Sequence, residues 1–177
     1  MRIFILCMFF SSSLFAQQFM CKDGEIRFFS DAPIEDIQAI NQQAMAVIDL
    51  QSGGFAFKVN IKDFVFPNSL MQEHFNESYL ESDQFPHSTF TGLIENFGDV
   101  SQKNTIEVSG ELVIHGISQK TKLQATIQEI GNSLHITSVF DVVLNDYDID
   151  IPKIMMYKIA EVIEVSVDMK LQKRSNE

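Results

Sequence analysis

Four histidines are the residues of this sequence best suited to metal binding or acid–base chemistry. They are His74, His87, His115 and His135. No two have the i, i+2 or i, i+4 spacing that brings two imidazoles onto one metal ion, and none belongs to an H-E-x-x-H run. This separation favours solvated or singly hydrogen-bonded histidines over a metal site.

Three aspartates form a second candidate metal site. Asp146, Asp148 and Asp150 stand in the run D-Y-D-I-D, which resembles the start of a calcium loop. Ile151 occupies the position where such a loop needs glycine, and Tyr157 the position of its bidentate glutamate. Because apolar residues alternate with the aspartates, we instead predict a half-exposed strand edge.

A row of glutamates, Glu73, Glu77 and Glu81, repeats every four residues. Like charges at this spacing repel one another mildly, so we expect a solvated helix face rather than a catalytic acid cluster. The sequence also contains no G-x-S-x-G elbow, no glycine-rich phosphate loop and no Cys–His pair with a catalytic spacing. We therefore predict a binding protein, without a cofactor, and no enzyme.

The N-terminal residues 1–16 have the composition of a secretory signal peptide. Arg2 is basic, residues 3–10 are apolar and residues 11–16 are smaller, which predicts cleavage before Gln17 and a periplasmic or secreted protein. An N-terminal membrane anchor is the alternative, although the apolar run is shorter than the roughly 20 residues of a span. We expect no integral membrane protein.

Two cysteines are present, and only one follows the predicted signal peptide. Cys7 lies inside that peptide, so Cys21 has no partner for an intramolecular disulfide. We predict a partly buried free thiol in the first strand. A lipid-modified cysteine is the alternative, but residues 18–20 lack the small side chains of such a signal. A homodimer remains possible, either through Cys21 or through an unpaired edge strand if the chain forms an open barrel.

Length and composition indicate one globular domain over residues 17–172, followed by a polar tail at 173–177. The chain has 177 residues, of which 45% are hydrophobic, and carries 16 Phe but no Trp. Its net charge of −11 argues against a nucleic-acid surface, which needs a basic patch. The aromatic load calls for an unusually apolar interior.

Most of the chain alternates apolar and polar residues, the pattern of half-buried strands. The segments are residues 17–20, 25–30, 44–50, 55–62, 90–94, 107–114, 122–127, 134–142 and 163–171. We expect the first two to form a hairpin around Lys22-Asp23-Gly24, and residues 32–39 to form one or two helical turns. About eight antiparallel strands predict a sandwich or a closed barrel.

Residues 64–90 contain the clearest helix, at about 68–80. Pro67 ends the incoming strand, and either Asn68 or a Ser69–Gln72 capping box begins the helix. An apolar stripe at i, i+4 and i+8 lines one face of it. That stripe consists of Met71, Phe75 and Tyr79.

Three segments resemble one known family. FxFPxSLMxEHFNExYLESxxFPxSxFxG at 64–92, VSGELVIHGISQKTKLQATI at 108–127 and IPKIMMYKIAEVIEVSVDMKL at 151–171 are similar to the YceI-like family. The resemblance implies an all-β, eight-stranded, lipocalin-like antiparallel barrel with the helix packed at its mouth. We also expect a short helix after Pro152.

The resemblance further implies an exported protein that holds a long apolar molecule, such as a polyisoprenoid, fatty acid or fatty amide, without catalytic activity. Three hypotheses remain open: a lipid carrier, a filled-barrel structural or stress-related protein, and a hydrolase of lipid-like substrates. We place His74 or Tyr79 near a polar headgroup. The predicted ligand-binding residues are Phe28, Phe57, Phe64, Phe66, Met71, Phe75, Tyr79, Phe90 and Phe140.

Overall fold

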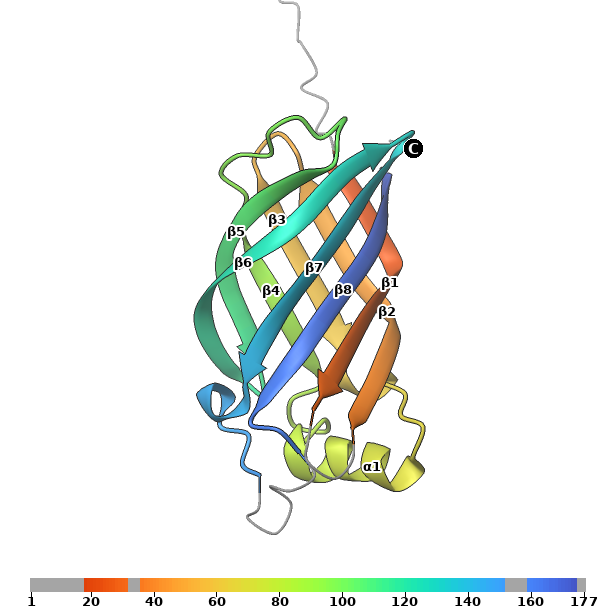
Figure 1. Cartoon of the computed structure of the whole chain (residues 1–177), viewed down its shortest axis with the longest axis vertical. Coiled ribbons are helices and arrows are strands. Elements are labelled where there is room, and N and C mark those ends of the chain that lie inside the picture. Colours follow the sequence, from red (N-terminus) through yellow and green to blue (C-terminus); the bar gives the residue numbers. More distant parts are fainter. Residues whose placement is uncertain (1–17, 32–35, 152–158, 175–177) are drawn as a thin grey trace, which may run out of the picture.

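The computed structural model describes residues 18–31, 36–151 and 159–174. In this part of the chain, eight strands follow one another and close into one antiparallel barrel (Figure 1). The predicted signal peptide and the predicted short helix after Pro152 lie outside the described residues. The predicted all-β barrel is confirmed.

Each strand pairs with its two neighbours in the sequence, and β1 pairs with β8 to close the sheet. No strand of the described barrel is left as an open edge, so the edge-pairing route to a dimer is absent there. The strands are β1 (Gln18–Ser30), β2 (Ile37–Asp49), β3 (Gly54–Asn60), β4 (His87–Leu93), β5 (Asn104–Ile114), β6 (Ile117–Ile130), β7 (Ser133–Val143) and β8 (Val162–Lys173).

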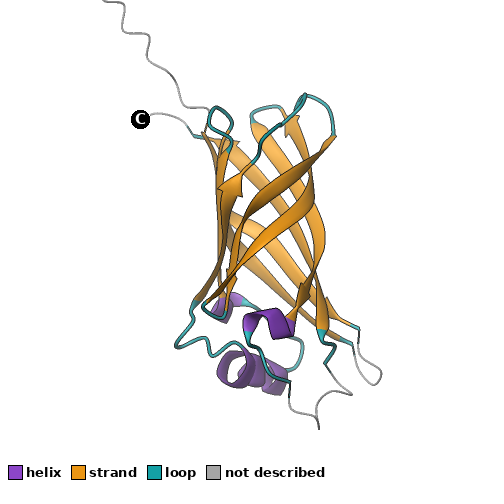
Figure 2. Cartoon of the chain, turned by 90° about the vertical axis from the view of Figure 1, so that its left-hand side faces the viewer, coloured by secondary structure: helices purple, strands orange, loops and turns teal. Residues whose placement is uncertain are grey.

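The helical segments gather at one end of the barrel (Figure 2). The chain between β3 and β4 forms η1 (Ile61–Asp63), α1 (Ser69–His74) and the π-helical turn η2 (Phe75–Tyr79). A further 3-10 turn, η3 (Leu144–Tyr147), follows β7 at the same end. We call this end the lid end, and the opposite end the plugged end.

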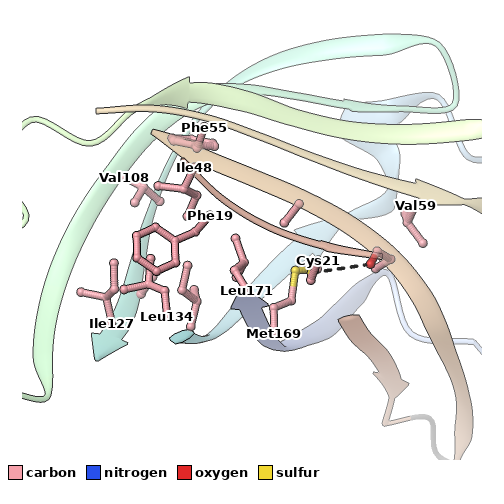
Figure 3. Packing of buried hydrophobic residues seen from close by; sticks show 14 of the residues in the cluster. Phe19, Cys21, Ile48, Phe55, Val59, Val108, Ile127, Leu134, Met169 and Leu171 are labelled. Atoms are coloured by element: carbon pink, nitrogen blue, oxygen red, sulfur yellow. Dashed lines mark hydrogen bonds between the residues drawn. The ribbon is translucent and has the colours of Figure 1, made fainter. Parts of the chain in front are cut away.

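The plugged end is filled by side chains that lie near the ends of the strands (Figure 3). Phe19, Ile127, Leu134 and Leu171 are at most 1% exposed and belong to one cluster. They project inward because successive strand residues point to opposite faces. Dense aliphatic packing therefore closes the barrel here.

Cys21 lies in the same cluster, and its thiol contacts the backbone oxygen of Ala44 at 3.9 Å. Burial raises the pKa of this thiol. The prediction of a free thiol in the first strand is confirmed. Because Cys21 is buried, it is not placed to bridge two copies of the chain.

The predicted hairpin at the start of the chain is wrong. Residues 18–30 form one continuous strand, with register irregularities against β2 between Cys21 and Gly24 and between Gly24 and Ile26. A Cβ at Gly24 would lie 2.8 Å from Met169 Cγ. Pairing with β2 and β8 thus overrides the local Asp-Gly turn signal, and the extra residues form a bulge.

Long-range pairing also affects two other local predictions, of which the helical turns at 32–39 lie partly outside the described residues. The described part of residues 32–39 is not helical, because β2 begins at Ile37, which pairs with Ser30. The expected polar tail begins later, because Lys173 belongs to β8 and Arg174 N donates to Gln18 O at 2.8 Å. Long-range ladders extend strands beyond their local patterns.

The predicted strand edge at the aspartate run is also wrong. Leu144–Tyr147 form η3, and Asp148 adopts a left-handed conformation with φ 54°. Tyr147 and Ile149 are buried, which explains why apolar residues alternate with the aspartates. In the described residues, no group of three or more His, Cys, Asp or Glu is placed to hold a metal ion.

Gly92 lets β4 and β5 lie close together, and the pairing at this position is regular, without a bulge. It pairs regularly with Phe55 and Gly110, and a Cβ on it would lie 2.1 Å from Ser109 O. The missing side chains at Gly92 and Gly110 leave room on the inner face for the rings of Phe55 and Phe90, whose centroids are 4.9 Å apart.

Candidate functional site

The barrel encloses a cavity of about 240 Å³ between the plugged end and the lid end. This exceeds the roughly 150 Å³ that suffices for benzene in an engineered protein cavity. Inward-facing residues of all eight strands line it, together with residues of the α1–η2 segment. The filled-barrel hypothesis requires side chains to fill the whole interior. The cavity shows that they do not.

All nine predicted ligand-binding residues line this cavity. They come from β1, β3, β4 and β7, from the chain before α1, and from α1 and η2 themselves. The nine are Phe28, Phe57, Phe64, Phe66, Met71, Phe75, Tyr79, Phe90 and Phe140. Their part in binding a ligand remains a prediction.

The α1–η2 segment begins at a well-formed cap. The Asn68 side-chain oxygen accepts hydrogen bonds from the backbone N–H of Leu70 and Met71, at 3.0 and 3.3 Å. The alternative capping box is wrong, because the Gln72 side chain instead accepts from Phe66 N at 3.3 Å. Asn68 therefore fixes where the helix starts, and Gln72 ties it to the incoming chain.

Phe75 fastens the segment to the barrel through an aromatic cluster. Its ring centroid lies 4.9 Å from that of Phe66, 5.4 Å from Phe28 and 5.7 Å from Phe64. Such tilted and stacked pairs contribute about 0.5–1.5 kcal/mol each beyond the area they bury. The segment thus covers the cavity with rings, and we call it the lid.

A second aromatic row runs along β3 and β4 on the cavity wall. The ring centroid of Phe55 lies 5.6 Å from that of Phe57 and 4.9 Å from that of Phe90. Phe57 and Phe90 are paired across the two strands. This row continues the aromatic lining from the lid toward the plugged end.

The lining has few polar side chains, and two of its serines are hydrogen-bonded to the backbone. Ser138 Oγ donates to Gln124 O at 2.6 Å, and Ser30 Oγ accepts from Ala160 N at 2.8 Å. Lys58 stands between Phe57 and Val59, so alternation places its side chain on the outer face. Among the described residues, the lining includes no Asp, Glu, Arg or His. The cavity therefore suits an apolar chain.

The two suggested headgroup residues differ in position. Tyr79 lines the cavity, whereas His74 does not belong to its lining. Burial raises the pKa of the Tyr79 phenol, so this hydroxyl remains neutral and able to donate a hydrogen bond at physiological pH. Of the two, Tyr79 is the one that a molecule in the cavity would meet.

The aromatic residues are only part of the wall, and the prediction missed the rest. The aliphatic half of the lining includes Ile26, Ile48, Leu112, Ile136, Val165 and Met169. The alternation in their strands marks every one of them as inward-facing. The signal was present, but it does not separate residues that border a cavity from residues that fill a core.

The predicted solvated glutamate face is correct for Glu73 and Glu77, which are exposed, and wrong for Glu81. Glu81 Oε2 lies 3.0 Å from His115 Nε2, and the His115 side chain is only 10% exposed. Glu81 has a φ of 42° and lies beyond the end of η2, which turns it away from the helix face.

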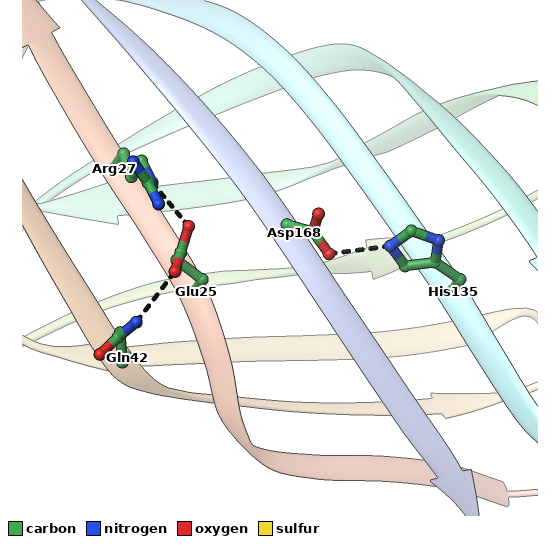
Figure 4. A network of polar contacts seen from close by, with 5 residues as sticks. All are labelled: Glu25, Arg27, Gln42, His135 and Asp168. Carbon is green, nitrogen blue, oxygen red and sulfur yellow. Dashed lines mark hydrogen bonds and ion pairs between the residues drawn. The ribbon is translucent and has the colours of Figure 1, made fainter.

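Another polar cluster lies on the outer surface of the barrel (Figure 4). Glu25 accepts hydrogen bonds from Arg27 at 2.6 Å and from Gln42 at 3.1 Å. The Arg27 hydrogen bond, followed by that of Gln42, lowers the pKa of Glu25. His135 and Asp168 pair at 2.8 Å on the neighbouring strands. The Glu25–Gln42 and His135–Asp168 contacts join neighbouring strands, and none of these residues belongs to the cavity lining.

The chain belongs to the YceI-like domain family, which matches residues 11–171. No curated protein matches the sequence. Among solved structures, the fold is similar to a polyisoprenoid binding domain from Saccharophagus degradans implicated in plant cell wall breakdown. That match has a TM-score of 0.79 at 11% identity and covers 90% of this chain and 99% of that one.

Two further structures share the fold. Burkholderia cenocepacia BcnA matches with a TM-score of 0.72 at 13% identity, covering 85% of this chain and 96% of that one. The Campylobacter jejuni YCEI protein matches with a TM-score of 0.66 at 15% identity, covering 80% and 88%. None of the helices in the described ranges is both long and apolar enough to span a membrane.

Proposed function

We propose that this chain binds one long apolar molecule, an isoprenoid or fatty-acyl chain, inside its barrel and acts as a carrier or sequestering protein. The observation that carries the proposal is the apolar cavity, which runs from the aromatic lid toward the plugged end. Burial of a chain there is favourable by about 0.8 kcal/mol per methylene group. One of the fold relatives is described as a polyisoprenoid binding domain, which agrees with this ligand class.

We propose no catalysis. The lining includes no carboxylate or imidazole among the described residues, so the commonest general acids and bases are missing there and the Tyr79 phenol is the titratable group that a bound chain would meet. This composition supports a binding site rather than the hydrolase of the third hypothesis. A screen with ester and phosphoester substrates tests this, and turnover that Tyr79→Phe abolishes would contradict the proposal.

The direct test is to identify what the purified protein carries. Protein isolated without detergent or denaturant is extracted with organic solvent, and the extract is analysed by mass spectrometry. We expect about one long-chain molecule per barrel. A matched sample of Phe75→Asp should be depleted of it, whereas Glu77→Ala should not. Empty extracts, together with no uptake of a polyprenol or fatty-acid probe, would overturn the proposal.

We also propose export to the periplasm. The composition of residues 1–16 supports it. Cell fractionation and N-terminal sequencing of the mature chain test this part separately. We expect a periplasmic protein that starts at Gln17, and a full-length chain retained in the membrane fraction would favour the anchor alternative.

A further inference from the structure

His115 lies where the lid meets the rest of the barrel. It occupies the β5–β6 turn, has a φ of 50°, and packs its ring edge-on against Phe85 at a centroid distance of 4.5 Å. Gly116 follows with a φ of 74°, and a Cβ on it would lie 2.6 Å from the Phe85 ring. The ring of His115 is therefore held in one orientation by its surroundings.

Both ring nitrogens of His115 face hydrogen-bond acceptors. Nδ1 lies 3.2 Å from the backbone oxygen of Tyr147 in η3, and Nε2 lies 3.0 Å from Glu81 Oε2. The other Glu81 oxygen accepts from the Gln84 amide at 3.0 Å. A carbonyl and a carboxylate can only accept hydrogen bonds, whereas neutral imidazole has a single N–H to donate. Both bonds therefore form only when the His115–Glu81 pair carries one additional proton.

Glu81 connects this pair to the lid. It directly follows Leu80, whose N–H donates to Phe75 O at 2.9 Å. Ser82, on its other side, donates to Asn76 O from its N–H at 2.8 Å and from its hydroxyl at 3.2 Å. The residues on either side of Glu81 are therefore bonded to the last turn of the lid, so His115 holds the end of the lid against the barrel.

We infer that His115 is a positioning residue for the lid: its proton-dependent bond to Glu81 latches the closed lid and slows exchange of the molecule in the cavity. This rests on the proposed function. Loss of the proton leaves the Nε2 lone pair facing the carboxylate, so one of the two bonds is lost. The latch is complete while the pair holds the additional proton, and it opens when a rise in pH removes that proton.

Other titratable groups on the surrounding elements do not take over this role. Asp83, on the segment after Glu81, pairs with Lys62 at 2.5 Å. In η3, Asp146 is exposed, and burial raises the pKa of the Tyr147 phenol, which keeps it neutral. Asp148 after η3, His87 at the start of β4 and Lys120 on β6 are all exposed. Among the titratable side chains described around the ring, Glu81 is the one hydrogen-bonded to it, since Tyr147 contacts it through its backbone oxygen.

Stopped-flow release of N-phenyl-1-naphthylamine, a neutral apolar fluorophore, tests the latch on the whole mature protein. We expect wild-type release to be about tenfold faster at pH 8.5 than at pH 5.5, as loss of one charge-assisted hydrogen bond requires. His115→Asn, which tolerates the positive φ, should release fast at both pH values.

Glu81→Gln is the decisive variant, because an amide donates to neutral imidazole and still accepts from Gln84. At pH 8.5 it should release as slowly as wild type at pH 5.5, whereas a merely structural Glu81 would give faster release. His135→Asn, which breaks the histidine–aspartate pair on the outer surface, should leave the wild-type pH dependence unchanged. A flat wild-type profile, or fast release from Glu81→Gln at pH 8.5, would overturn the inference.

A second measurement needs no ligand and separates the latch from the proposed function. Nitrogen NMR of the His115 ring should show two N–H groups at pH 5.5. Hydrogen-exchange protection of the Leu80 and Ser82 amides should fall as pH rises in wild type, but not in Glu81→Gln. Failure of the fluorophore to bind would count against the proposed function, while unchanged protection would overturn the latch.

Discussion

The two ends of the barrel are built from the same alternating strands but are filled in opposite ways. At the plugged end, aliphatic side chains and Phe19 are almost completely buried. At the lid end, aromatic rings meet at centroid distances of about 5 Å and many remain partly exposed to the cavity. The comparison teaches that one end is packed as a solid core, while the other leaves an apolar cavity beneath a cover of aromatic rings.

The largest effect should follow from creating a hole in the plugged end. Leu134→Ala removes a side chain that is 0% exposed, so we expect a loss of about 4 kcal/mol in the free energy of unfolding. Leu112→Ala, on the cavity wall, should cost about 2 kcal/mol, because its side chain already borders empty space. Urea unfolding measures both. Equal losses would break the distinction between the two ends.

The next effect concerns the lid itself. Phe75→Asp places a carboxylate among the rings of Phe28, Phe64 and Phe66, so we expect retention of the apolar ligand to fall on the order of fiftyfold or more. Glu77→Ala, on the exposed face of the same segment, should leave retention unchanged. Ligand content after gel filtration is the readout, and similar losses in both variants would argue against a lid.

A smaller effect should follow from loss of the helix cap. Asn68→Ala removes the acceptor for two backbone N–H groups, which costs about 1 kcal/mol. Since the cap is confined to the lid, we expect faster hydrogen exchange in α1 and little change in the exchange of β1 or β8. A uniform rise across the barrel would show that the lid and the plugged end unfold as one unit.

The smallest effect should come from the outer surface. The lowered pKa of Glu25 means that its bonds to Arg27 and Gln42 contribute stability above the ordinary glutamate range, and that this contribution is lost as pH falls through the lowered pKa. Because the pair is largely exposed, Glu25→Gln should change stability by less than about 1 kcal/mol. Urea unfolding of wild type and Glu25→Gln at pH 7 and pH 3 measures this difference. A larger loss at pH 7 would show that contacts on the outer surface contribute as much to stability as contacts in the core.

Local alternation and helical spacing were sufficient for the strands, for the lid helix and for most of the aromatic cavity lining, although Phe55 was missed. The choice of a closed barrel over a sandwich came from the resemblance to the YceI-like family. Local patterns were insufficient where pairing with distant strands decides the outcome, as at Cys21–Gly24 and at the start of β2. The Glu81–His115 contact joins residues 34 positions apart, so no local pattern indicates it. The sequence also does not distinguish a filled barrel from a hollow one, because the same pattern of inward-facing apolar residues is compatible with either.

The pairing of β1 with β8 has a consequence for how the protein can be held. The start of β1 and the end of β8 lie at the end of the barrel away from α1 (Figure 1). Gln18 and Arg174 are joined there by backbone and side-chain hydrogen bonds of 2.8 and 3.0 Å. A tether joined directly to Gln18 or Arg174 would therefore start from the plugged side. A copy held in this way would present its lid on the side opposite the attachment.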